Sequence, residues 1–347
     1  ASSSIFKVLL RLDEDREPDR FEALISTLQN LGLSQELRSA VLAENPEVSG
    51  LAIRVLNGLD SAESREILRS TFWSRDRDEQ RAITKSLSRM PDQSSIDFFF
   101  QVLTTHEDGS ILKNGISFLG QTMGVQEASD TILGFLTHPY DDVKERALEA
   151  CIALDTESIR ERFRQMLRMD DPLHRFMAVH ALGQLNDQQS LPEFRKALHD
   201  LEADVRKVAL EALFSLTGDQ EERLIVALQA LEDDNPEVRK VAVGLLGQSC
   251  LPAAEDHLRQ ALNDRDEWVC IRALDSLIHR ASLSDRDVDQ LMTLFSKGQT
   301  ILKLKIIDVL GRIGEKASFK ALFAILENED WEIQEAADRA LTQLKTA

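Results

Sequence analysis

A pattern of hydrophobic positions with helical spacing repeats along most of this chain. From an anchor residue, a small or aliphatic residue follows four positions later, and usually a leucine four positions after that. The ten triplets are Val48/Ala52/Leu56, Glu79/Ile83/Leu87, Ile111/Gly115/Leu119, Val143/Ala147/Cys151, His174/Ala178/Leu182, Val205/Ala209/Leu213, Val238/Ala242/Leu246, Val269/Ala273/Leu277, Leu302/Ile306/Leu310 and Ile333/Ala337/Leu341. Successive anchors are 31 to 33 residues apart, a period typical of stacked supersecondary units. The pattern therefore predicts an array that offers a long surface instead of one deep cleft.

One period, residues 188–216, shows how each unit is built. A first helix is predicted from the hydrophobic positions Leu191, Phe194, Leu198 and Leu201. Acidic residues between 200 and 204 suit a turn and the positive N-terminal end of a second helix. An apolar stripe over residues 205–216 then marks that second helix. Two helices and two short turns fill the period.

These repeats predict an all-α, right-handed α-solenoid of about ten helical hairpins over residues 34–347. Residues 1–33 depart from the period, with a charged break at 13–18 followed by an amphipathic helix at 19–31. We interpret this segment as an N-terminal helical cap, because terminal repeats of such arrays are usually atypical. The alternative is a remnant of an upstream region, since the apolar segment 5–12 looks like the end of a helix whose start is missing. We therefore hypothesise that the sequence is a fragment of a longer protein.

Two stretches of the repeat, residues 204–213 and 236–247, resemble HEAT repeats. They are most similar to the short bacterial kind that also occurs in phycobilisome lyases. The resemblance is strong at 138–280 and 327–344 and weaker before 125 and around 296–313, where Ser296, Lys297, Gly298 and Gln299 replace the acidic turn. It implies a solenoid whose second helices line the concave side. It implies little about activity, because the family includes scaffolds, adaptors and a few enzymes.

Charge and cysteine content narrow the possible partners and compartments. The formal net charge of -19 repels phosphate backbones, so nucleic acid is an unlikely partner. Three cysteines without a CxxC pair favour neither a disulfide framework nor a zinc site, and we expect Cys151 to be a small buried residue. No run of 18 apolar residues and no signal peptide is visible, so we predict a cytoplasmic protein without a membrane span in this chain.

The sequence offers no constellation that favours catalysis or a cofactor. Deoxyhypusine hydroxylases, a HEAT-repeat enzyme class, use several His-Glu dipeptides to bind two irons, whereas this chain has one, His106-Glu107. We interpret His106 as a solvated turn residue and expect no metal, because converging ligands need several copies. Neither a Gly-x-Ser-x-Gly elbow nor a glycine-rich phosphate loop is present. Gly120, Gly183 and Gly247 each follow the last residue of a triplet and indicate a close helix approach or a helix end.

Aromatic residues could serve either as core or as partner anchors. We expect Trp73, Trp268, Trp331 and Tyr140, which lie near turns, to be core or partly core residues. Three adjacent phenylalanines at 98–100 cannot all lie on one helical stripe, and we expect packing between repeats.

The predicted binding line consists of the second and sixth positions after each anchor, which should point away from the apolar stripe. The residues predicted to contact a partner are Arg81, Lys85, Lys113, Glu149, Phe176, His180, Glu211, Ile271, Asp275, Leu304 and Asp308. The first repeats are basic along this line and the later ones mixed or acidic, a polarity that could orient a partner. Phe176, Ile271 and Leu304 are apolar at nominally exposed positions. Cations one position after the anchor, such as Arg206 and Arg239, are expected to pair with turn acids of the same or the preceding repeat.

The leading hypothesis is a non-catalytic scaffold or adaptor that binds a protein partner along its concave surface. One alternative is an enzyme subunit of the phycobilin-lyase type, in which the solenoid helps to attach a chromophore. Another is a regulatory domain of a larger membrane or signalling protein. The identity of the partner and the oligomeric state are not encoded in any motif.

Overall fold

The computed structural model describes residue 23 and residues 34–59, 61–280, 283–314, 316–328 and 330–346. They form two compact units, residues 1–161 and 162–347, which divide within helix α11. The predicted helix at 19–31 and the cap assigned to residues 1–33 lie outside the described residues, apart from Ala23, so that domain boundary stays a prediction.

Unit 1 is built from helical hairpins. Its α-helices are α3 (Ser34–Val41), α4 (Pro46–Leu59), α5 (Ala62–Thr71), α6 (Arg77–Leu87), α7 (Ile96–Thr105), α8 (Gly109–Ser117), α9 (Ser129–Gly134), α10 (Asp141–Leu154) and the start of α11 (Glu157–Met166). Short helical turns are η1 (Phe72–Ser74), η2 (Gln93–Ser95), the π-helical η3 (Phe118–Thr122), η4 (Gln126–Ala128) and η5 (Phe135–Thr137).

Unit 2 continues the same alternation. After α11 come α12 (Pro172–Gln184), α13 (Leu191–Ala197), α14 (Ala203–Leu216), α15 (Gln220–Ala230), α16 (Pro236–Gln248), α17 (Ala253–Ala261), α18 (Glu267–His279), α19 (Val288–Lys297), α20 (Thr300–Ile313), α21 (Lys316–Asn328) and α22 (Trp331–Thr346), with short turns η6 (Gln188–Ser190) and η7 (Asp285–Asp287). The described residues are helices and connections without a strand, so the prediction of an all-α solenoid is confirmed.

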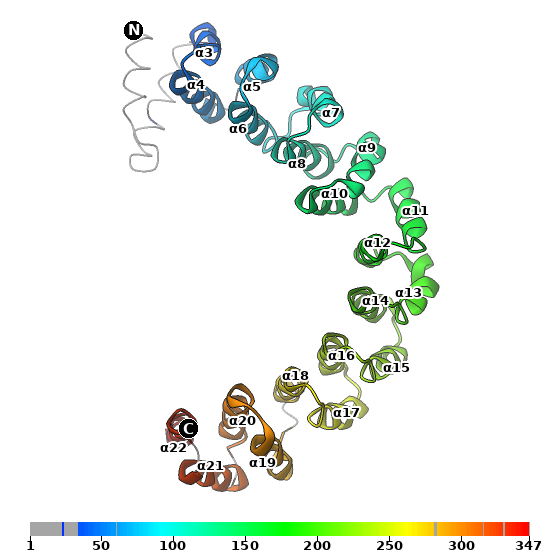
Figure 1. Cartoon of the computed structure of the whole chain (residues 1–347), viewed down its shortest axis with the longest axis vertical. Helices are drawn as coiled ribbons and strands as arrows, with labels where there is room; N and C mark the ends of the chain where they lie inside the picture. Colours follow the sequence, from blue (N-terminus) through cyan, green and yellow to red (C-terminus); the bar gives the residue numbers. More distant parts are fainter. Residues whose placement is uncertain are drawn as a thin grey trace. The chain divides into compact units, whose positions relative to one another are not determined.

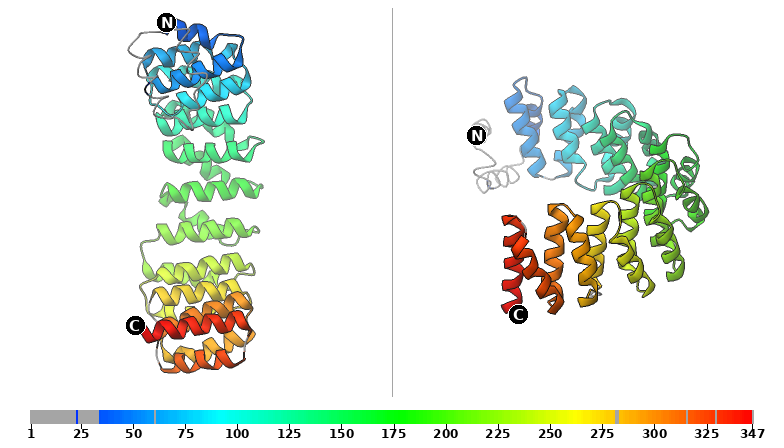
Figure 2. Two further views of the ribbon diagram at one scale, coloured as in Figure 1. Left: turned by 90° about the vertical axis from the view of Figure 1, so that its left-hand side faces the viewer. Right: turned by 60° about the horizontal axis from the view of Figure 1, so that its bottom comes forward.

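Within each unit the helices form two layers (Figure 1). The even-numbered helices, which are the second helices of the hairpins, pack side by side and form what we call the inner layer. The odd-numbered helices form the outer layer. In unit 2 the even-numbered inner helices, from α12 to α22, pack side by side in chain order (Figure 2).

Short polar residues and prolines start several of the inner helices. The Asp171 carboxylate accepts a hydrogen bond from the Leu173 N–H, and Pro172 occupies the first turn of α12. Asn235 caps α16 in the same way, again before a proline. The Asp266 side chain accepts from two backbone N–H groups at the start of α18. Because these N–H groups have no partner inside the helix, such caps fix where each inner helix begins.

The predicted triplets lie on the inner helices, with Leu119 in the π-helical turn η3 that follows α8, and their second and third residues form the core. All ten residues four positions after an anchor, and all ten residues eight positions after it, are buried. Cys151 is among them, as expected. Small residues at the fourth position allow neighbouring helix backbones to approach closely.

Glycines one position after the triplets mark the closest crossings between inner helices. A Cβ added at Gly120 would lie 2.5 Å from the Cβ of Ala150, and one at Gly183 would lie 3.0 Å from the Cβ of Ala212. At Gly247 the nearest atoms belong to Ser276 of the next inner helix, from 2.6 Å. The prediction of close helix approach at these glycines is confirmed.

A ladder of arginines joins consecutive turns in unit 2, and it corrects the pairing expected for Arg206 and Arg239. Arg206 donates from Nε and Nη2 to both carboxylate oxygens of Asp233, at 2.7 and 2.8 Å. Arg239 pairs in the same bidentate way with Asp264 at 2.8 Å. These acids belong to the following repeat, not to the same or preceding one. Arg206 contacts the turn of its own repeat through the backbone, because its Nη1 donates to the carbonyl oxygens of residues 200 and 201.

The aromatic predictions had mixed outcomes. Phe99 is fully buried and stacks on Phe118 with ring centroids 4.4 Å apart, while Phe98 packs edge-on against Phe72 of the preceding hairpin, so packing between repeats is confirmed. The core prediction for the tryptophans and Tyr140 is wrong. Trp73, Trp268, Trp331 and Tyr140 are all exposed, because they lie at helix ends and turns beside the buried stripe.

Leu201 was also misassigned to the first helix of its repeat. Helix α13 ends at Ala197, and the Leu201 side chain is 93% exposed in the turn. The acidic turn begins earlier than the hydrophobic spacing suggested.

Candidate functional site

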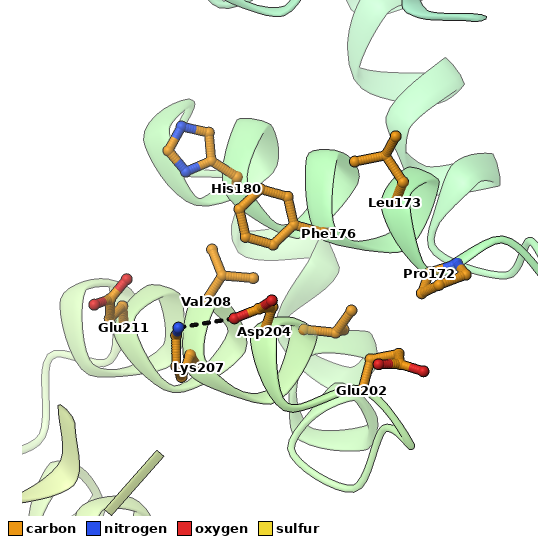
Figure 3. Close-up of a pocket in the computed structure, with 10 residues that line it drawn as sticks. Pro172, Leu173, Phe176, His180, Glu202, Asp204, Lys207, Val208 and Glu211 are labelled. Carbon is orange, nitrogen blue, oxygen red and sulfur yellow. Dashed lines mark hydrogen bonds and ion pairs between the residues drawn. The ribbon is translucent and has the colours of Figure 1, made fainter. Parts of the chain in front are cut away.

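A groove lies between α12 and α14 on the inner layer of unit 2. It has a volume of about 590 Å³ and is lined by Pro172, Leu173, Phe176, His180, Glu202, Asp204, Val205, Lys207, Val208 and Glu211. Figure 3 shows that one wall comes from α12 and the other from α14 and the turn before it. Three residues of the predicted binding line, Phe176, His180 and Glu211, lie together in this groove.

The α12 wall is apolar and aromatic because its outward positions carry no charge. Leu173 is 42% exposed, and Phe176 is half-buried. The rings of Phe176 and His180, one helical turn apart, are nearly parallel, with centroids 6.2 Å apart and an interplanar angle of 7°. Such a wall offers a flat apolar surface to a partner side chain.

The α14 wall places charge around an apolar floor. Lys207 donates to the Asp204 carboxylate at 2.8 Å, so these two charges offset one another. Glu202 and Glu211 are exposed at opposite ends of the groove (Figure 3). Val208 lies between them and is buried. The groove therefore combines an apolar floor with a rim that has an excess of carboxylates.

The remaining predicted residues of unit 2 lie on α18 and α20. Ile271 and Leu304 are half-buried and pack their inner sides against the core. Asp275 is paired with Lys305 across the two helices at 2.5 Å. Asp308 is exposed and lies 3.2 Å from Arg312. This second group is thus an apolar pair bordered by an ion-pair cluster.

The predicted residues of unit 1 form a polar surface whose basic character is largely offset by neighbouring acids. Arg81 makes an ion pair of 2.6 Å with Asp108 of the following turn, and this hydrogen bond lowers the pKa of the Asp108 carboxyl. Lys113 is paired with Asp142. Glu149 is paired with Arg146 at 2.8 Å, and Lys85 is exposed. These four residues point to solvent without an apolar recess between them.

His106 was expected to be a solvated turn residue, and the structure shows a bonded one. It is half-buried at the end of α7, its Nε2 lies 3.1 Å from the Gln80 Oε1, and its Nδ1 accepts from the Asp108 N–H. Burial lowers the pKa of its imidazole. Within the described residues, no group of three or more His, Cys, Asp or Glu side chains could hold a metal ion. No described helix is long and apolar enough to cross a membrane.

Sequence reasoning missed several exposed apolar residues. Leu173, Trp268 and Ile301 each stand one position before an anchor, and they are 42%, 54% and 57% exposed. A residue at that position lies about 100° around the helix from the anchor, on the side of the second position after it. The register alone could therefore have added them to the binding line.

The comparisons with known proteins agree with the fold. Residues 129–213 and 225–301 match HEAT repeats. No curated protein sequence is significantly similar to the chain.

Solved structures with this architecture are distant in sequence. Kap121p has a TM-score of 0.61 at 13% identity, over 99% of this chain and 46% of its own. Kap95p, in a structure with RanGDP, has a TM-score of 0.62 at 11% identity, over 99% and 55%. The Escherichia coli protein YibA has a TM-score of 0.50 at 17% identity, over 79% and 99%. The chain spans about half the length of Kap121p and Kap95p, and these similarities show the fold alone.

Proposed function

This chain is a HEAT-repeat protein, and from that premise we propose that it is a non-catalytic scaffold or adaptor. Its partner is another protein, held against the inner layer of unit 2. The predicted binding line becomes, in this proposal, a line of contacts that includes Phe176, Ile271 and Leu304.

The single observation that carries the proposal is the groove around Phe176. An aromatic ring and an exposed leucine lie next to each other on α12, above the buried Val208 of α14. Apolar side chains grouped in a recess with a polar rim are typical of interaction sites in folded proteins. Phe176 is half-buried, unlike the buried core residues Ala178 and Leu182 of the same helix, so part of its ring is open to a partner.

Solved structures with a similar fold support the proposal that the partner is a protein. Kap121p has been crystallised bound to Nup53p and to Pho4p. Kap121p therefore shows a helical stack of similar fold that binds another protein.

The test is affinity capture with three versions of the full chain. Phe176→Asp places a charge in the groove and should lower recovery of the specific partner at least tenfold, since loss of one apolar anchor typically costs that much. Ile225→Asp is the control, because it places the same charge at an exposed apolar residue (55% exposed) on the outer helix α15. Circular dichroism verifies that both variants fold. Equal recovery of partners by the wild type and Phe176→Asp would refute the assignment of the groove.

A further inference from the structure

The inner layer of unit 2 has a banded composition when its helices are compared at equivalent positions. The positions one before and two after the anchor are apolar on three helices, as Leu173 and Phe176 on α12, Trp268 and Ile271 on α18, and Ile301 and Leu304 on α20. Each pair is three residues apart and therefore shares one helix face. Helices α18 and α20 are neighbours in the stack. The four residues lie at matching positions on these adjacent helices, and we call them the Trp268 patch.

Helices α14 and α16, which follow α12 in the inner layer and precede α18, carry charge at the same positions. On α14 they are Asp204 and Lys207, and on α16 they are Glu237 and Lys240, paired at 2.7 Å. The region between the groove and the Trp268 patch is therefore polar and internally paired. An apolar segment continuous over the whole span would leave these ion pairs facing a hydrocarbon surface, which is unfavourable.

Charge distinguishes the two apolar regions. The groove carries Glu202, Asp204 and Glu211 against the single cation Lys207, so it has an excess of two negative charges. Beside the Trp268 patch, the acids Asp275 and Asp308 are matched by Lys305 and Arg312. A complementary partner needs cations at the groove and none at the patch.

The distance between the two regions sets the length of the partner segment. Helices α12 and α18 are three steps apart in the inner layer, and packed helices are separated by roughly 8–10 Å. The span is then about 24–30 Å, which an extended chain covers with about seven to nine residues. A segment of that length can contact both regions at once, so the second contact becomes intramolecular and strengthens binding.

We propose that unit 2 binds one extended protein segment with two apolar side chains about nine residues apart. The first side chain occupies the groove at Phe176 and is flanked by lysine or arginine facing Glu202 and Glu211. The second covers the Trp268 patch. This inference rests on the proposed function, since it specifies the chemistry of the segment that the scaffold holds.

The experiment uses fluorescein-labelled synthetic peptides of 14 residues and the full chain, with binding measured by fluorescence anisotropy. The reference peptide has two leucines nine positions apart on a Gly-Ser frame, with three lysines around the first leucine. One altered peptide has the leucines four positions apart, a second has serine in place of the second leucine, and a third has glutamates in place of the lysines. The reference peptide should bind at least tenfold more tightly than each altered peptide.

Two protein variants test separately where the peptide contacts the groove and where it contacts the Trp268 patch. Glu211→Lys is a surface change that removes the groove's excess of two negative charges, so it should largely abolish the wild-type preference for the lysine peptide over the glutamate peptide. In a Trp73→Phe/Trp331→Phe background, Trp268 is the only tryptophan, and its emission should shift to shorter wavelength with the reference peptide but not with the peptide that lacks the second leucine.

Equal affinity for the two leucine spacings, an unchanged charge preference in Glu211→Lys, or no binding of the reference peptide would overturn the inference. These outcomes do not decide the proposed function, which the capture comparison of Phe176→Asp with Ile225→Asp judges independently.

Discussion

Gly120→Ala tests whether the inner helices are held at the close crossing that the repeat pattern implies. Gly120 lies in the π-helical turn after α8, and a Cβ added there would lie 2.5 Å from the Cβ of Ala150 and 3.2 Å from its backbone Cα on α10. Because a backbone atom blocks the site, a rotamer change cannot relieve the clash and the helices must separate. Overpacking of this kind typically costs about 1–3 kcal/mol.

The intrinsic preference of alanine for helices acts in the opposite direction. It is worth up to about 1 kcal/mol in a helix interior, so we expect a net loss of roughly 1–2 kcal/mol. Urea denaturation followed by circular dichroism measures this difference. Gly50→Ala in α4 is the matched control, since a Cβ there would meet nothing within 4 Å. That variant should be as stable as the wild type or about 0.5–1 kcal/mol more stable.

A compensating change makes the test specific. Ala150→Gly removes the methyl group that the new side chain would strike, so the double variant should be less destabilised than the sum of the two single variants. The reasoning would be refuted if Gly120→Ala matched Gly50→Ala in stability, or if the two substitutions were simply additive.

Two further predictions concern titratable groups. The hydrogen bond from Arg175 lowers the pKa of the Asp200 carboxyl below its ordinary 3.8. As pH falls, the unfolded chain therefore binds this proton before the folded chain does, so the stabilisation from the pair is present above pH 4 and is lost as pH falls through the folded-state pKa. Asp200→Asn should lower the free energy of unfolding by about 2 kcal/mol at pH 7 and make it fall less steeply in acid; parallel curves of stability against pH for the two proteins would contradict this. Burial raises the pKa of the Cys151 thiol to about 12 and that of the Cys270 thiol to about 11, whereas Cys250 is exposed. Ellman's reagent should therefore react with one thiol in the folded protein and with three in urea. Rapid reaction of all three thiols without urea would show that Cys151 and Cys270 are accessible, against this prediction.

The fold could be predicted because one packing arrangement is repeated. A buried alanine such as Ala209 recurs at the same register in most repeats, and the period of the sequence is the period of the stack. The close crossings at Gly120 and Gly247 could be predicted for the same reason, since a missing side chain at a fixed position marks a contact that each hairpin makes with the next.

The exposed residues were harder to predict, because whether a side chain near a turn is buried depends on the residue at which the helix begins or ends. Tryptophan is usually buried, so the core was expected for Trp268, yet this residue lies in the first turn of α18 and is exposed beside the buried stripe. The partner of Arg206 was placed in the wrong repeat, because the distance between successive turns is a property of the stacked structure. The groove joins Phe176 of one hairpin to Glu211 of the next, a contact that neither helix encodes alone.

Site-specific photocross-linking tests the central claim, that the inner layer of unit 2 holds the partner, most directly. Benzoylphenylalanine is placed at Lys207, in the groove on α14, or at Gln229, exposed on the outer helix α15. The account predicts a covalent adduct with the captured partner from position 207 and none from position 229. Adducts of equal yield from both positions, or from position 229 alone, would contradict it.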